Sequence, residues 1–229
     1  MLVSANAGPQ HQGGRIQFGP DGMLYVALGD GDRPADAQDR ASPRGKILRM
    51  TPWGAPAPGN PFPHSRVWSF GHRNSFGFGF DPKTGNLWET ENGPHCNDEL
   101  NRIVAGGNFA WGPHEDEDCV PALPGALETN RDGPSPRRQP EAEWTPTIAP
   151  TGIAFCDGCG LGPAFAGRGL IADFNHSEIT RITLSGNRRH VTGRSVVFEA
   201  PHPITSVEVG SDSAIYISLP AGIYRLAPA

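Results

Sequence analysis

One local pattern recurs along this chain and restricts the folds open to it. An apolar residue is followed by a turn built on Pro-Asp-Gly or a related sequence, and then by alternating apolar residues, in residues 16–28, 79–89 and 207–218. Turns of this composition between stretches of period-two alternation are strong signals for β-hairpins. A degenerate fourth copy lies in residues 153–155 and 169–174. The chain is therefore expected to fold as a series of antiparallel hairpins.

A further apolar strand is expected after three of these hairpins, in residues 45–50, 178–184 and 222–226. Units of about four strands that repeat every 40–60 residues or so are typical of propeller blades. No segment of a dozen residues keeps a clean helical period, which argues against a helical or doubly wound fold. The prediction is an all-β protein, a β-propeller of four-stranded antiparallel blades with about four blades represented.

Glycine and proline support this prediction, because 30 Gly and 24 Pro among 229 residues suit many short strands joined by turns. Residues 1–229 are expected to form one partial propeller domain, since β folds of this length commonly form single domains. Residues 32–43 and 114–140 are predicted to be loops. Long connections in compact β domains often carry function.

Charge and hydropathy exclude several classes of partner. The net charge is −5 and the 19 basic residues are scattered, so we expect no nucleic-acid binding. No stretch of about twenty apolar residues is present to span a membrane. The first six residues lack the charged and apolar regions of a secretory signal, so no signal peptide is expected within this chain.

Four cysteines form two local groups, Cys96 with Cys119 and Cys156 with Cys159. The even number is compatible with two disulfides. Free structural thiols are an alternative. The spacing between Cys156 and Cys159 also suits half of a metal site or a redox pair, although Cys96 and Cys119 do not have the spacing of a zinc ribbon.

A set of short motifs occurs in a fixed order along nearly the whole chain. They occupy residues 10–16, 18–30, 45–49, 60–62, 71–74, 91–94, 97–101, 106–112 and 146–152. Together these motifs resemble the soluble glucose/sorbosone dehydrogenase family, also called the PQQ-dependent aldose sugar dehydrogenases.

The resemblance implies a six-bladed propeller that binds pyrroloquinoline quinone (PQQ) and calcium on its top face. It also implies oxidation of an aldose sugar at its anomeric hydroxyl to a lactone, and transfer of the electrons to an acceptor of unknown identity. With the cysteine pairs, it places the protein outside the cytoplasm, in the periplasm or secreted. Family members carry about two more blades before residue 10, so this chain resembles a member that lacks its N-terminal third. Exposed blade edges would then favour association with another chain.

The resemblance assigns the catalytic base and two cofactor contacts. His11 matches the general base, and a neutral imidazole suits removal of the sugar hydroxyl proton. Arg73 and Asn74 match residues that contact the quinone oxygens, where a permanent cation would stabilise developing negative charge. The neighbouring His72 is expected to be structural.

The resemblance also assigns two calcium sites. The backbone carbonyls of Gly93 and Pro94 would bind the ion beside the cofactor, since calcium takes oxygen ligands and tolerates irregular geometry. Glu99 and the carbonyl of Phe109 match a second, structural calcium site. The acidic residues 115–118 are expected to form a solvated loop.

The chain departs from the family where the cofactor carboxylates are held. A lysine position falls on Asn175, and two arginine positions fall near Pro203 and Thr205. The aromatic residue that stacks on the quinone aligns with Thr145, although the adjacent Trp144 could replace it, and Thr147 does agree. Four arginines later in the chain could replace the missing cations: Arg181, Arg188, Arg189 and Arg194. Buried carboxylates without partners are costly.

The sequence is therefore also compatible with two alternatives to an enzyme. One is a calcium-stabilised propeller that acts as a binding module without redox chemistry. The other is an inactive truncated fragment.

Overall fold

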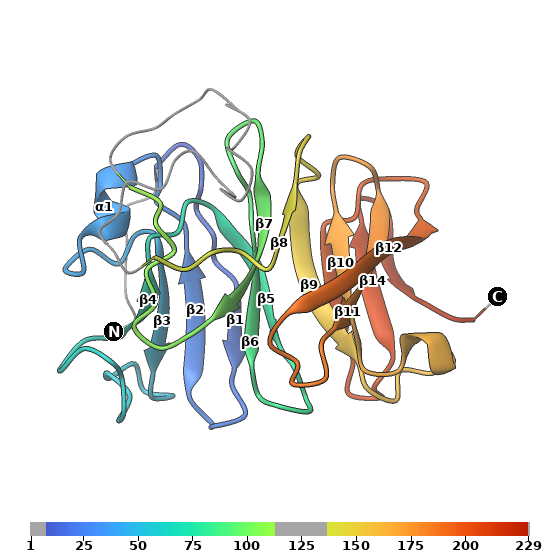
Figure 1. Cartoon of the computed structure of the whole chain (residues 1–229), viewed down its shortest axis with the longest axis horizontal. Coiled ribbons are helices and arrows are strands. Elements are labelled where there is room, and N and C mark those ends of the chain that lie inside the picture. The colour runs from blue at the N-terminus through green and yellow to red at the C-terminus, as the bar shows by residue number, and fades with distance from the viewer. Residues whose placement is uncertain (1–7, 113–136, 229) are drawn as a thin grey trace.

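The computed structural model describes residues 8–112 and 137–228, and within them four antiparallel sheets follow one another along the chain (Figure 1). We call them the first to fourth blades. The first contains β1 (Ile16–Phe18), β2 (Leu24–Leu28), β3 (Lys46–Met50) and β4 (Val67–Phe70). The second contains β5 (Ser75–Phe80), β6 (Leu87–Glu91), β7 (Asp98–Ile103) and β8 (Ala142–Trp144).

The third blade contains β9 (Pro150–Cys156), β10 (Arg168–Asp173), β11 (Glu178–Leu184) and β12 (Val191–Glu199). The fourth has three strands, β13 (Ser206–Val209), β14 (Ile215–Leu219) and β15 (Gly222–Arg225). In every blade the strands pair in chain order. The predicted all-β fold with about four propeller-type blades is confirmed.

Turn chemistry explains why the hairpins form where the sequence predicts them. In the β1–β2 turn, Asp21 accepts hydrogen bonds from the Met23 N–H at 3.0 Å and from the Tyr25 hydroxyl at 3.1 Å. Arg49 on β3 donates to the same carboxylate at 2.8 Å. An aspartate that binds the backbone two residues on stabilises a tight turn.

The fourth blade repeats this arrangement with other residues. Asp212 accepts from the Ala214 N–H at 3.1 Å and from the Tyr216 hydroxyl at 3.0 Å, and Arg225 lies 3.7 Å away. The first and last described blades therefore share one local design, which supports the internal repeat seen in the sequence.

The hydrophobic core lies between adjacent blades. Phe78 and Leu87 pack with Tyr25 and Ile47 between the second and first blades. Equivalent clusters separate the second from the third blade and the third from the fourth; they include Trp88, Leu100, Phe155 and Ile171, and Leu170, Ile179, Ile215 and Ile217. Each sheet is thus stabilised by its neighbours.

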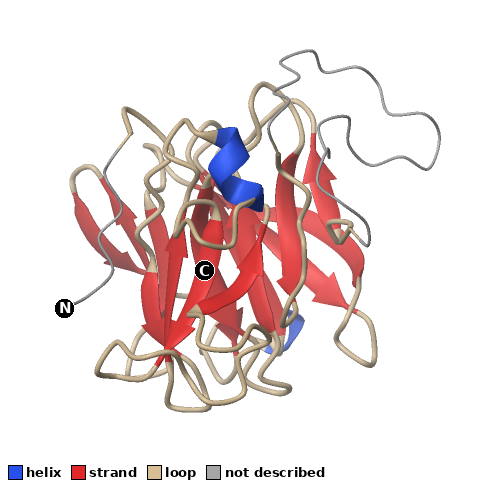
Figure 2. Ribbon diagram, turned by 90° about the vertical axis from the view of Figure 1, so that its left-hand side faces the viewer, coloured by secondary structure: helices blue, strands red, loops and turns tan. Residues whose placement is uncertain are grey.

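The connections at one end of the blades carry the candidate site. The segment predicted as a loop over residues 32–43 contains a short helix, α1 (Pro34–Gln38), which lies above the ends of the strands (Figure 2). A second short helix, η1 (Pro163–Phe165), connects β9 with β10. Both are shorter than a periodic sequence pattern can reveal. Within the described residues, no helix is long and apolar enough to cross a membrane.

Cysteine pairing is resolved in part. Cys156 and Cys159 form a disulfide with their Cα atoms 5.0 Å apart, so the prediction of a bond in this group is correct for the structure. The expected pairing of Cys96 with Cys119 involves a residue outside the described part of the chain. The expected acidic loop of residues 115–118 lies there too.

Candidate active site

Asp30 is the centre of the first polar cluster at this end of the blades. Its carboxylate is fully buried just after β2, where His11 Nδ1 lies 2.8 Å from Oδ1. Trp111 Nε1 donates to Oδ2 at 2.7 Å. The Asp30 N–H donates to the Arg73 carbonyl at 2.7 Å. One carboxylate thus joins residues that are far apart in sequence.

This contact holds the His11 ring in one orientation. Because the carboxylate accepts at Nδ1, the imidazole hydrogen lies on that atom and Nε2 carries the lone pair. Asp32 Oδ1 lies 3.2 Å from the same Nδ1 and strengthens this orientation. The His11 side chain is 12% exposed, so the ring keeps limited access to solvent or a ligand. The sequence analysis assigned no role to Asp30. An aspartate two residues after an apolar strand could have marked it as a candidate site residue.

Arg73 belongs to the second polar cluster. Its backbone N–H donates to Glu91 Oε1, and its Nη1 donates to the carbonyls of Asn92 and Gly93, both at 2.9 Å. The guanidinium carbon lies 5.3 Å from the centre of the Trp111 ring, a cation–π contact. Arg73 therefore lies against the Gly93 carbonyl, the oxygen expected to bind calcium.

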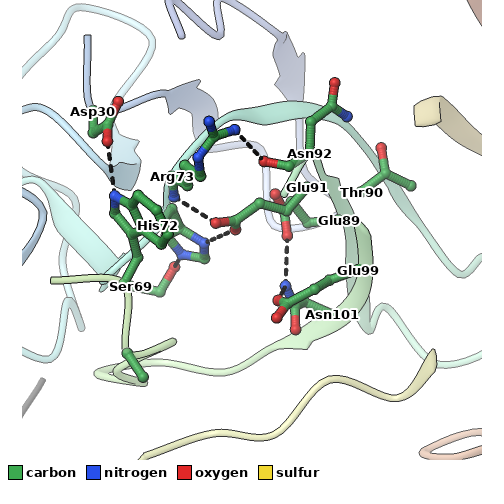
Figure 3. A network of polar contacts seen from close by, with 12 residues as sticks. Asp30, Ser69, His72, Arg73, Glu89, Thr90, Glu91, Asn92, Glu99 and Asn101 are labelled. Carbon is green, nitrogen blue, oxygen red and sulfur yellow. Dashed lines mark hydrogen bonds and ion pairs between the residues drawn. The ribbon is translucent and has the colours of Figure 1, made fainter. Parts of the chain in front are cut away.

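A buried chain of hydrogen bonds supports Arg73 from below (Figure 3). His72 Nδ1 lies 2.9 Å from Glu91 Oε2, and His72 Nε2 lies 2.9 Å from Ser69 Oγ. The His72 ring also stacks on Phe109 with centroids 4.8 Å apart. His72 is fully buried and fixes the Glu91 carboxylate, which is the structural position expected for it.

A small cavity joins several of the predicted site residues. It is lined by Arg73, Glu91, Asn92, Gly93, Asn97, Glu99, Phe109 and Trp111. The cavity thus brings together four residues assigned from separate motifs: Arg73, Gly93, Glu99 and Phe109. His11, Asn74, Pro94, Trp144 and Thr147 do not line it.

Asp98 fixes the turn that carries Gly93. Its carboxylate accepts from the N–H groups of Gly93, Ile148 and Ala149 at 2.6–2.7 Å. Burial raises the pKa of Asp98 to about 6, although the three N–H donors oppose the shift. The turn after β6 is thereby tied to the segment before β9.

The cavity fits a hard cation. Carbonyl oxygens of Asn92 and Gly93 already converge on a positively charged group, the Arg73 guanidinium. The carboxylates of Glu91 and Glu99 lie on the same cavity. Carbonyl and carboxylate oxygens are the ligands that calcium prefers.

The region expected to hold the cofactor carboxylates contains few positively charged side chains. Asn175, at the family's lysine position, donates to the Thr147 carbonyl at 2.9 Å. Arg188 binds Asp81 at 2.5 and 2.7 Å near the other end of the blades. Arg181 donates to the Ala164 carbonyl at 3.3 Å. These arginines do not converge on the Arg73 cavity, so the described residues fit the quinone end of the cofactor and not its carboxylate end.

The aromatic candidate for stacking lies in a different environment. Trp144 packs against the cluster between the second and third blades, and the Arg194 guanidinium carbon lies 5.1 Å from its ring centre. The neighbouring Thr145 exchanges hydrogen bonds with Asn97, on the cavity wall, at 2.7 and 3.1 Å.

The fold and the site define a class: an all-β protein of propeller-type blades. Its site combines a histidine–aspartate pair with an arginine and a small cavity lined by oxygen atoms. The family model described as "Glucose / Sorbosone dehydrogenase" matches residues 3–223. The chain belongs to this family, as its motifs predicted.

Two curated proteins are similar to most of this chain. The chain is 27% identical over 217 residues to aldose sugar dehydrogenase YliI of Escherichia coli, covering 90% of this chain and 56% of that protein. It is 32% identical over 243 residues to the uncharacterized protein slr1608 of Synechocystis, covering 92% and 53%. The chain therefore spans little more than half the length of these relatives.

Two solved structures are also similar to this chain. The PQQ-bound form of aldose sugar dehydrogenase from Streptomyces coelicolor matches with a TM-score of 0.74 and 36% identity, covering 92% of this chain and 56% of that one. A "putative oxidoreductase (glucose dehydrogenase)" from Thermus thermophilus matches with a TM-score of 0.77 and 37% identity, covering 94% and 62%.

Proposed function

We propose that this chain carries the proton-accepting and quinone-binding part of a PQQ- and calcium-dependent aldose sugar dehydrogenase. The observation that carries the proposal is one connected unit, in which Asp30 binds His11 and Trp111 while the Trp111 ring lies under the Arg73 guanidinium. A base and a permanent cation are thus held beside each other by shared contacts. The PQQ-bound Streptomyces relative supports the cofactor assignment.

His11 acts as the general base in this proposal. Asp30 holds the Nδ1 hydrogen, so Nε2 takes the proton of the anomeric hydroxyl, and the product is a lactone. The buried Asp30 carboxylate stabilises the imidazolium that forms, because charge–charge attraction is stronger away from water. Pyrroloquinoline quinone, when bound, supplies a carbonyl that accepts hydride from the anomeric carbon, and calcium beside it acts as a Lewis acid.

In this proposal Arg73 and Asn74 would bind the quinone oxygens, while the carbonyls of Gly93 and Pro94 would hold the calcium ion. Glu99 and the Phe109 carbonyl would hold the second ion. Thr147 and Trp144 are the remaining candidates for cofactor contacts. The electrons then pass to an acceptor of unknown identity, outside the cytoplasm.

A second candidate function is a calcium-stabilised binding module without redox chemistry. It is favoured by one observation: the arginines considered as substitutes, Arg181 and Arg188, bind groups away from the cavity. A cofactor with several carboxylates would then lack part of its anchorage.

A titration with PQQ and calcium, followed by a dye-reduction assay with aldoses, tests both functions. We expect the folded chain to bind PQQ in the presence of calcium and to reduce the dye. His11→Gln should lower kcat by about 100-fold or more with PQQ affinity retained, because general-base catalysis commonly contributes this much. His64→Gln, in an exposed loop, is the matched control.

The variant Asp30→Asn tests whether the Asp30 carboxylate supports His11 in catalysis, separately from cofactor binding. We expect it to lower kcat and to shift the pH profile, since the amide no longer stabilises the imidazolium. A chain that unfolds cooperatively and binds calcium but never PQQ would reject the dehydrogenase and support the binding module.

A further inference from the structure

Gln38, the last residue of α1, lies outside the site described above but is bonded to it. Its Nε2 donates to the carbonyl of Trp111 at 2.5 Å and to Asn108 Oδ1 at 3.0 Å. Asn108 Nδ2 donates in return to Gln38 Oε1 at 3.1 Å. Two amide side chains that are 70 positions apart in sequence thus form a reciprocal pair, which also binds the backbone of Trp111.

Asn108 fixes the backbone that leads to Trp111. Asn108 is buried, and its Oδ1 also accepts from the Ala110 N–H at 2.9 Å. Ala110 is fully buried with a φ of 76°, a left-handed conformation that alanine seldom adopts. Such a conformation persists only where the surrounding contacts enforce it. The pair of Gln38 and Asn108 supplies contacts of this kind on both sides of Ala110.

The amide pair depends on the close approach that Gly71 allows. A Cβ atom added to Gly71 would lie 2.4 Å from Asn108 Oδ1 and 2.7 Å from Gln38 Nε2. Gly71 also donates its N–H to the Ala37 carbonyl at 3.0 Å, and Lys46 Nζ donates to the same carbonyl at 2.9 Å. The end of α1 is therefore fixed against the first blade, which places the Gln38 amide at a defined position.

Trp111 connects this pair with the candidate site. Its indole Nε1 donates to Asp30 Oδ2 at 2.7 Å, and its ring centre lies 5.3 Å from the Arg73 guanidinium carbon. A hydrogen bond weakens steeply when its geometry departs from the preferred range. A small shift of the Trp111 backbone would therefore weaken the bond to Asp30 and move the ring relative to Arg73.

We propose that Gln38 is a positioning residue of this site. With Asn108 it sets the backbone of Trp111, so that the indole binds Asp30 and the ring supports Arg73. The consequence for catalysis rests on the function proposed above, whereas the effect on Trp111 does not. Loss of the Gln38 amide removes a donor from the Trp111 carbonyl and from Asn108 Oδ1, and Trp111 then shifts away from Asp30.

NMR of the Trp111 indole N–H tests this proposal in the full chain without PQQ. The variant Trp111→Phe identifies the signal among those of the five tryptophans. We expect Gln38→Met to shift that signal and to speed its exchange with heavy water by about tenfold or more, because hydrogen bonds that hold Trp111 are lost. Gln139→Met, at an exposed glutamine before β8, should leave the signal and its exchange unchanged.

An unchanged Trp111 signal and exchange rate in folded Gln38→Met would overturn the proposal. An equal rise in exchange at all protected amides would also reject it, since that result indicates a general loss of stability. If Gln38→Met does not fold, Gln38→Asn takes its place. Its amide is one methylene too short to reach both partners, so the same change at Trp111 is expected.

The consequence for catalysis is tested separately with PQQ and calcium added. We expect Gln38→Met to lower kcat in the wild-type background and to have no further effect in the Trp111→Phe background, because its effect passes through Trp111. Equal effects in the two backgrounds would contradict this route. A chain that binds no PQQ would refute the proposed function, while the indole measurement would still decide the role of Gln38.

Discussion

Asp30 illustrates how much a single residue can organise in this protein. It lies only two residues after β2, yet it binds His11, nineteen positions earlier, and Trp111, 81 positions later. The strand end fixes its backbone, and full burial strengthens each hydrogen bond to its carboxylate. Motif matching identified His11 and Arg73 but could not reveal this link, because the link depends on where Trp111 returns to the first blade.

Lys46 is a second residue whose environment depends on the tertiary structure, since lysine side chains are seldom fully buried. Its side chain is fully buried at the start of β3. Nζ donates to the carbonyls of Asp36, Ala37 and Arg44 at 2.6–2.9 Å and so closes the end of α1. Burial lowers the pKa of Lys46 to about 7, although the charges of Asp39 and Asp36 oppose the shift.

This pKa predicts a pH-dependent stability. Between pH 7 and 10.5 the unfolded chain holds the Lys46 proton while the folded chain loses it, so this residue makes the free energy of unfolding rise with pH. The slope is at most about 1.4 kcal/mol per pH unit. Below pH 7 both states are protonated and the slope vanishes.

Urea unfolding of the wild type and Lys46→Met at pH 7, 8 and 9 measures this effect. We expect the stability of the wild type relative to the variant to increase over that range. Lys83→Met removes the chain's other lysine, which is exposed, and should show no such trend. A difference that stays constant with pH would contradict the prediction.

At the scale of elements, the blades meet through glycines on their first strands. A Cβ atom added to Gly77 on β5 would lie 2.5 Å from the Gly152 Cα on β9. A Cβ on Gly79 would lie 2.5 Å from the Ile153 carbonyl oxygen. Backbone therefore packs against backbone between the second and third blades, and this contact positions the Gly93 turn relative to the segment before β9.

Gly77→Ala should therefore destabilise the protein by about 1–3 kcal/mol, the usual cost of overpacking a rigid interface. Thermal and chemical unfolding provide the measurement. Gly186→Ala is the matched control, because no atom lies within 4 Å of its added Cβ. Equal stability of the two variants would mean that the interface accommodates the added methyl group and would contradict the prediction.

Hairpins and turns were predictable at this scale, while the inter-blade contacts were not. Asp21 and Asp212 form their turns from residues two to four positions away, and such local bonds can be read directly from sequence. By contrast, nothing in the local sequence distinguishes Gly77 and Gly152 from other glycines in strands. Their close approach appears only when the two sheets are packed together.

In the described residues the four blades lie side by side in chain order (Figure 1), and large apolar side chains are exposed on the first and the last of them. Ile16 and Phe18 on β1 are 55% and 58% exposed, and Ile223 on β15 is 77% exposed. Beside β15 lies a groove of about 740 Å³ whose lining includes Phe165, Val197, Phe198, Tyr224 and Leu226. The free edge of β15 has no strand partner among the described residues.

Such an edge favours addition of another strand, so we expect concentration-dependent self-association. Ile223→Lys should weaken it by about tenfold or more, because a charge on the edge opposes pairing. Sedimentation velocity over a range of concentrations gives the measurement. Trp53→Lys removes another highly exposed apolar residue, from a loop of the first blade, and is the control. A wild type that remains monomeric would contradict this expectation.

The sequence by itself determined the hairpins, their order and the family, because turn residues and period-two alternation act over a few positions. It also assigned site roles to Arg73, Gly93, Glu99 and Phe109, and the structure brings these four residues to one cavity. Only the tertiary structure decided that Asp30 links His11 to Trp111, that the distant arginines turn away from that cavity, and that Gln38 binds the Trp111 carbonyl. These properties depend on which blades pack together and which side chains that packing buries. Both are long-range features that a local sequence pattern does not specify.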